Sequence, residues 1–139
     1  MGAKPTAPKT VNIALKKRRK RGKQTMKTLT LNAWGTAHQI SFRLSNYAEN
    51  NNLYVGLICY DDGYPEPWSD LTVNLSVKCA ENCAFIDTNN NGKSILEWLV
   101  LNELATPTGR TCQSGFCIYP EMKFDMDELM KYTTKGQII

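Results

Sequence analysis

The sequence lacks the features on which most enzyme assignments depend. Histidine occurs once, at position 38, between an alanine and a glutamine, so a nucleophilic triad cannot be argued from the sequence. Glycine-rich phosphate loops are also missing, since residues 107–110 (Pro-Thr-Gly-Arg) have neither the required spacing nor the strand-to-helix setting. The most apolar run, residues 95–101, is interrupted by Glu97 and is far too short to cross a bilayer. These absences make an enzyme the less favoured class and predict no membrane partner.

Neither a secretion signal nor a disulfide framework is evident. The apolar stretch near the N-terminus, residues 11–15, is shorter than a signal peptide requires. Because the cysteine count of five is odd, we expect reduced thiols and a cytoplasmic protein of a bacterial host, or a nuclear one if the source is eukaryotic. A zinc site is the alternative, but neither pair of cysteines has the usual Cys-x2-Cys spacing. The zinc site would consist of Cys79, Cys83, Cys112 and Cys117. The sequence instead favours buried thiols and predicts no metal or cofactor.

Acidic residues are absent from the first 28 positions, which hold ten of the seventeen lysines and arginines. We therefore divide the chain into a polybasic arm, residues 1–27, and one domain, residues 28–139, which carries the remaining seven basic and all thirteen acidic side chains. With few apolar residues, the arm is expected to be disordered when free. Its charge density is typical of segments that bind the phosphates of RNA or DNA, and its lack of aromatic residues argues against base stacking. The predicted nucleic-acid-binding residues are Lys16, Lys17, Arg18, Arg19, Lys20, Arg21 and Lys23.

Other partners would also suit such an arm. A nuclear import receptor, an acidic protein or a purely solubilising role are the alternatives to a nucleic acid.

The hydrophobic pattern predicts an α+β fold. Apolar and polar residues alternate or form short apolar runs bounded by turn residues, which is typical of strands. Strands are expected at residues 28–34, 39–45, 53–60, 71–77, 83–87 and 115–119, and helices at 94–104 and 125–132. The first four strands follow one another without a helix, which favours antiparallel pairing. The sequence therefore predicts an antiparallel meander sheet of four to six strands, with one main helix and a short C-terminal helix on one face.

Residues 61–70 are interpreted as a surface loop, because Asp, Gly and Pro supply turn chemistry. The side chains of this loop, together with an arginine in a second predicted turn, are candidates for contact with a protein partner. They are Asp61, Asp62, Tyr64, Glu66, Trp68 and Arg110. The alternative is a metal-dependent nuclease. Its magnesium would bind to carboxylate oxygens. The four acids concerned are Asp61, Asp62, Glu66 and Asp70.

Four short segments between residues 47 and 132 form a recognisable pattern: 63–75 (GYPEPWSDLTVNL), 82–90 (NCAFIDTNN), 107–110 (PTGR) and 114–120 (SGFCIYP). In order and spacing they resemble a family of small, uncharacterised single-domain proteins of mobile elements and phages of Gram-positive bacteria. That pattern includes Cys83 and Cys117 but not reliably Cys79 or Cys112, which weakens the zinc alternative. The resemblance implies no catalytic residues, and it implies an anti-CRISPR or anti-restriction context. The polybasic arm lies outside it.

The charge division and the resemblance together predict a non-enzymatic binding protein. The acidic domain is expected to dock on a basic, nucleic-acid-binding protein or ribonucleoprotein, while the arm contacts RNA or DNA in the same assembly. Inhibition of a CRISPR ribonucleoprotein would use both halves of the chain. A general nucleic-acid-binding accessory protein of transfer or replication is the first alternative, and the nuclease is the second.

Overall fold

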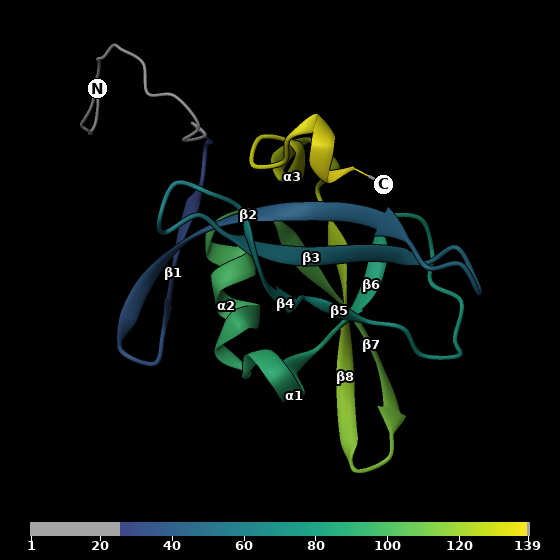
Figure 1. The fold of residues 1–139 in the computed structure, drawn as a ribbon. Coiled ribbons are helices and arrows are strands. Elements are labelled where there is room, and N and C mark those ends of the chain that lie inside the picture. The colour runs from purple at the N-terminus through teal and green to yellow at the C-terminus, as the bar shows by residue number, and fades with distance from the viewer. Residues whose placement is uncertain (1–25, 139) are drawn as a thin grey trace.

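The computed structural model describes residues 26–138, and the earlier part of the polybasic arm lies outside the described residues. These residues form two four-stranded antiparallel sheets and three short α-helices (Figure 1). The predicted antiparallel pairing is confirmed. The prediction of one α+β meander sheet is wrong, because the strands divide between two sheets and the fold is mostly β.

The first sheet is a meander in the order β1-β2-β3-β4. In β2, Phe42 and Leu44 are buried while Arg43 between them is exposed, as their alternation predicts. β4 is an edge strand, and it contains Pro67. Proline is tolerated there because some backbone N–H groups of an edge strand have no neighbouring strand to pair with. The strands are β1 (Leu29–Ala33), β2 (Thr36–Asn46), β3 (Leu53–Cys59) and β4 (Glu66–Asp70).

The second sheet has the order β5-β6-β8-β7 and contains the later strands. They are β5 (Thr72–Val73), β6 (Cys83–Ile86), β7 (Ala105–Ser114) and β8 (Cys117–Phe124). β7 and β8 form a long hairpin that extends away from the rest of the protein (Figure 1). Its turn contains Gly115 and Phe116, and the Phe116 side chain is fully exposed. The predicted strand at 115–119 therefore begins two residues too early.

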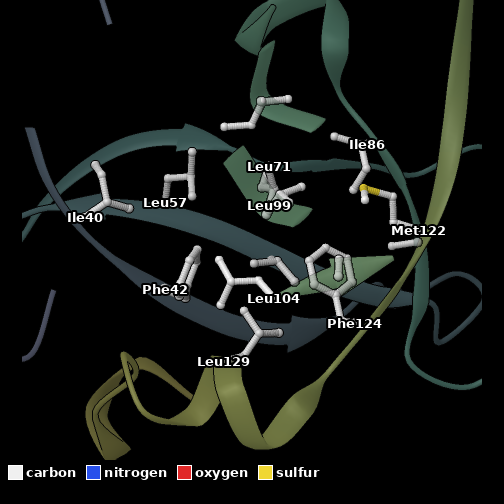
Figure 2. Close-up of a cluster of buried hydrophobic side chains, with 14 of the residues drawn as sticks. Ile40, Phe42, Leu57, Leu71, Ile86, Leu99, Leu104, Met122, Phe124 and Leu129 are labelled. Atoms are coloured by element: carbon white, nitrogen blue, oxygen red, sulfur yellow. The ribbon is translucent and has the colours of Figure 1, made fainter. Parts of the chain in front are cut away.

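The main hydrophobic core brings together side chains from both sheets and the helices (Figure 2). Ile40, Phe42 and Leu57 come from the first sheet, and Leu99 and Leu129 come from α2 and α3. Burying each of these large side chains stabilises the fold by about 1.5–3 kcal/mol. A second, smaller cluster consists of Leu75, Cys79, Cys83 and Phe85. Because alternate residues of β6 belong to the two clusters, all four residues of that strand are buried.

The predicted strand at 71–77 is wrong beyond Val73, although its sequence alternates. The side chain of Asn52, which is buried, donates to the Val77 carbonyl and accepts from the Cys79 N–H. Asn50 also donates from its amide to the Leu75 carbonyl. These amides satisfy backbone groups that a strand would pair with a neighbouring strand. The segment therefore runs as a loop, and the fourth strand of the first sheet is β4, inside the predicted loop 61–70.

The helices are shorter than predicted. α2 (Ser94–Leu101) ends three residues early, and its N-cap, Lys93, makes no side-chain capping hydrogen bond, so Ser94 and Glu97 do not form a capping box. It buries Ile95 and Leu99, whereas Leu101 is 74% exposed. A further helical turn, α1 (Thr88–Asn91), lies between β6 and α2. α3 (Met126–Met130) is capped by Asp125, whose side chain accepts hydrogen bonds from two backbone N–H groups.

Residues 107–110, which include the arginine expected in a turn, instead lie within β7 at an irregularity of its pairing with β8. Within residues 26–138 no helix has the length and apolar character needed to cross a membrane.

The C-terminal segment covers the part of β2 that β1 does not reach. The Phe42 N–H donates to the Tyr132 carbonyl at 2.9 Å, and Leu44 forms a parallel bridge with Ile138. The ammonium of Lys27 lies over the Tyr132 ring, 5.3 Å from its centroid. The chain therefore enters β1 beside Tyr132, at the end of that strand opposite the β1–β2 turn.

Candidate binding site at the end of the first sheet

Five of the six predicted partner-contact residues lie together, on the β3–β4 connection and on β4. They are Asp61, Asp62, Tyr64, Glu66 and Trp68. In an antiparallel meander, the end of β3 and the start of β4 lie at the same end of the sheet as the β1–β2 turn. That turn adds Trp34, and the start of β2 adds His38.

His38, Cys59 and Asp61 form a compact polar group at this end of the sheet. Asp61 accepts a hydrogen bond from the Gln39 N–H at 2.7 Å, and its other oxygen lies 2.8 Å from Nδ1 of His38. The hydrogen bond from the Gln39 backbone N–H lowers the pKa of the Asp61 carboxyl, and the hydrogen bond with His38 adds a smaller effect in the same direction. Asp61 thereby attaches the start of the β3–β4 connection to β2.

These three residues are also the set that could hold a metal ion. One nitrogen, one sulfur and one oxygen atom lie within 4.8 Å of one another, and zinc accepts all three ligand types. Nucleophilic catalysis is a poorer fit. Burial raises the pKa of the Cys59 thiol, and the side chain of Asp61 adds to this effect, whereas a reactive cysteine requires a lowered pKa.

Trp68 lies against this polar group. Its ring centroid is 4.4 Å from that of His38, and 5.8 Å from that of Trp34, with the two indoles tilted by 45°. Trp68 is half-buried, whereas 85% of Trp34 is exposed. The His38–Asp61 contact therefore supports one face of an aromatic pair whose other member extends into solvent.

The aromatic pair borders a cleft of about 600 Å³. The end of the β1–β2 hairpin forms one wall, and α1 with the start of α2 forms the other. Asn91 joins α1 to β4, because it donates to the carbonyls of Asp70 and Asp87 and accepts from the Ser69 hydroxyl. The remaining lining is rich in amides and hydroxyls, including Asn32, Asn89, Asn90 and Ser94.

The four acids of the nuclease alternative do not converge. Asp61 binds His38 and Gln39, whereas Asp70 accepts a 2.6 Å hydrogen bond from the Tyr54 hydroxyl. Burial, followed by Asp70, raises the pKa of Tyr54 to about 12. Within residues 26–138, no three of the four carboxylates come close enough to share one metal ion, and neither do three of the cysteines of the zinc alternative.

Arg110, the sixth predicted contact residue, lies on β7 away from this site. It donates to both carboxylate oxygens of Glu121 on β8 and to the Lys78 carbonyl. Its guanidinium carbon lies 5.4 Å from the centroid of the Phe85 ring. These contacts give Arg110 a structural role in joining the β7–β8 hairpin to the loop before β6.

The predicted nucleic-acid-binding residues of the arm all lie outside the described residues. They are Lys16, Lys17, Arg18, Arg19, Lys20, Arg21 and Lys23.

The sequence prediction omitted Trp34 and the contact of His38 with Cys59 and Asp61. Trp34-Gly35 between two alternating segments is a hairpin signal that could have placed Trp34 at a turn. The group around His38 has no such signal, because it depends on the register in which Ile40 faces Cys59.

Residues 41–137 match the family model of a domain of unknown function, DUF4313. This match covers more than half of the chain, so the protein belongs to the DUF4313 family. No curated protein and no solved structure matches the chain significantly. The matched region contains Cys59, Asp61, Trp68 and Arg110, whereas Trp34, His38 and the polybasic arm precede it.

Proposed function

We propose that this protein is a non-enzymatic binding protein that joins a nucleic acid to a basic protein. The single observation that carries the proposal is the division of charge along the chain. The arm holds ten basic and no acidic side chains, and the remainder holds seven basic and thirteen acidic ones. The arm suits the phosphates of RNA or DNA, whereas the acidic domain would repel them. A partner that combines nucleic acid with basic protein fits both parts.

The placement of acidic side chains in the domain supports this proposal. Asp62 and Glu66 are exposed on the β3–β4 connection and on the edge strand β4. Neither forms an ion pair within residues 26–138. Carboxylates of this kind are available to a positively charged protein surface, where they would speed association and select against acidic partners.

The proposed biological context is counter-defence by a mobile element, in the cytoplasm of a bacterial host. It rests on the resemblance set out above, since the DUF4313 family has no function attached to it. A nucleic-acid-containing defence complex, such as a CRISPR ribonucleoprotein, offers the composite surface that the charge division requires. Inhibition would follow from occupying that surface, with no chemical step.

The arm is tested by neutralising it. The seven basic residues at positions 16–21 and 23 are changed to glutamine in the full chain, and binding to labelled duplex DNA and RNA is measured between 50 and 200 mM salt. Wild-type affinity should fall by about three to five orders of magnitude over this range, as expected for several phosphate contacts. The variant should bind weakly, with a shallow salt dependence. The matched control changes the exposed domain residues Lys93 and Lys123 to glutamine and should bind as the wild type does.

Unchanged binding by the arm variant would exclude the arm as the nucleic-acid contact. The counter-defence context is tested separately, by transforming a targeted plasmid into cells with an active CRISPR system. The wild-type protein should restore plasmid uptake, and the arm variant should not. Full restoration by the arm variant would contradict the use of both halves of the chain.

A further inference from the structure

The most exposed aromatic residue at the cleft is also in an unfavourable backbone conformation. Trp34 has φ 50° and Gly35 has φ 76°, and the two residues connect the paired Ala33 and Thr36. A two-residue hairpin turn with both φ angles positive prefers Asn-Gly, and a bulky residue in this region is strained. A strained tryptophan that exposes 85% of its surface contributes little to folding. A binding role would account for it.

The position of Trp34 is nevertheless well defined. Its ring lies beside Trp68, which in turn contacts His38, and His38 is held by Asp61. The aromatic pair is therefore arranged before any ligand binds, which lowers the entropic cost of binding.

The amides of the cleft offer hydrogen-bonding groups next to the aromatic pair. Asn32 and Asn89 line the cleft, are exposed, and make no side-chain hydrogen bond within residues 26–138. Asn91 is different, because it is fully engaged with Ser69, Asp70 and Asp87 and serves as a wall. A ligand between the walls would meet the aromatic pair and one free amide from each wall, Asn32 on β1 and Asn89 on α1.

The charges around the cleft select the ligand. Asp61, Asp62, Glu66 and Asp70 are exposed on the adjoining loop and on β4. Lys93, between two lining residues, is the basic residue next to the cleft in sequence. This surplus of negative charge disfavours the phosphates of a nucleotide and favours a cation. Among cations, a guanidinium stacks on indole rings and forms several directed hydrogen bonds with carbonyl oxygens.

We propose that the cleft beside Trp34 and Trp68 binds an arginine side chain of the basic protein partner. This inference rests on the proposed function, because it assigns the part of the domain that docks on that partner. The arginine would stack on the exposed face of Trp34 and donate to the amides of Asn32 and Asn89. The acidic side chains of β4 and its preceding loop would attract the neighbouring basic residues of the partner.

The test uses the full-length chain and a short synthetic peptide in which arginine alternates with glycine. Binding is measured by calorimetry, and the indole N–H signal of Trp34 is followed by NMR. The peptide should shift this signal, and Trp34→Asn should weaken binding by about tenfold. Asparagine suits the turn, so this variant should remain folded. Phe116→Ser removes an even more exposed aromatic side chain, at the β7–β8 turn and outside the cleft lining, and should leave the affinity unchanged.

Several results would overturn the inference. Equal affinity of the Trp34→Asn variant and the wild type would exclude the cleft. So would tighter binding of the corresponding lysine peptide, or a Trp34 signal that responds to a single-stranded oligonucleotide but not to the peptide. If the peptide bound only to the chain with the neutralised arm, the natural occupant would be the protein's own arm. Nucleic-acid binding by the arm is measured separately, by the salt series with the neutralised arm, so the inference about the cleft can fail while the arm's proposed role stands.

Discussion

Arg110 on β7 faces Glu121 on β8, and Nη2 of the guanidinium lies 2.8 Å from Oε2 of the carboxylate. The Glu121 side chain is buried, whereas that of Arg110 is about half exposed. Thr108 also donates from its hydroxyl to Glu121, at 2.7 Å. Residues 107–110 therefore form an irregular part of the hairpin that is held in place by one buried carboxylate.

Arg110→Ala should destabilise the protein without unfolding it. The substitution leaves the Glu121 carboxylate buried with Thr108 as its remaining side-chain donor, and such a loss costs roughly 2–3 kcal/mol when one partner is half exposed. Urea denaturation followed by circular dichroism measures the change. Arg43→Ala, at an exposed position of β2, is the control and should change the free energy of unfolding by less than about 0.5 kcal/mol. Equal effects of the two substitutions would contradict a structural role for Arg110.

The same contact predicts how stability depends on pH. The hydrogen bond from Arg110 lowers the pKa of Glu121 from its ordinary value of 4.5, and the Thr108 hydroxyl adds a smaller effect in the same direction. Because the pKa is lower in the folded than in the unfolded state, the ionised carboxylate stabilises the fold above pH 4.5. This contribution is lost as the pH falls through the lowered value. Asp61, whose pKa is also lowered, acts in the same direction.

Glu121→Gln removes this titration. Its free energy of unfolding should be lower than that of the wild type at pH 7, and the difference should shrink as the pH falls below 4.5. Unfolding midpoints in urea at a series of pH values between 3 and 7 provide the measurement. A difference that stays constant over this range would show that Glu121 does not carry the predicted linkage.

Asn52 is predicted to hold the loop before β6. Its buried amide bonds to both Val77 and Cys79, so Asn52→Ala leaves two backbone groups unsatisfied and should cost about 2 kcal/mol. The Cys79 thiol should also become accessible. In the wild-type protein, burial and, to a smaller extent, the nearby Glu121 raise the pKa of the Cys79 thiol to about 11. The thiol is therefore slow to react.

Thiol labelling with mass spectrometry tests this prediction. Cys79 of the Asn52→Ala variant should react with iodoacetamide much faster than that of the wild type, whereas Cys59 should remain protected. Asn46→Ala, which removes an exposed hydrogen bond to Asn51, is the control and should leave Cys79 unreactive. Equal labelling of Cys79 in all three proteins would mean that Asn52 does not secure the loop.

The contrast between Asn52 and the alternating segment 71–77 shows what the sequence could predict. β1, β2 and β3 follow from periodicity, because their side chains meet one core in register. The segment after Val73 has the same periodicity, but its backbone bonds to amides from residues more than twenty positions away. Long-range side-chain bonds of this kind leave no local signal. The division into two sheets was unpredictable for the same reason.

The candidate site was predictable only in part. The acids and aromatics of residues 61–70 gather in one segment, which predicts a shared surface, and five of them do share one end of a sheet. Arg110 follows Gly109, which predicts an exposed turn residue, but the structure pairs it with Glu121. The contact of Trp34 with Trp68 joins residues that are 34 positions apart, and it depends on how the β1–β2 turn lies relative to β4.

Trp34 is predicted to reduce stability. Because its positive φ suits asparagine better than tryptophan, Trp34→Asn should raise the free energy of unfolding by about 0.5–1 kcal/mol. The lost contact with Trp68 opposes this gain, but it is small because most of the Trp34 ring is exposed. Thermal unfolding of the full-length variant measures the net change. Trp34→Val, a β-branched residue at the same position, should instead destabilise the turn. If both substitutions destabilised the protein equally, packing of the Trp34 ring would outweigh turn strain, and its exposure would need no binding role.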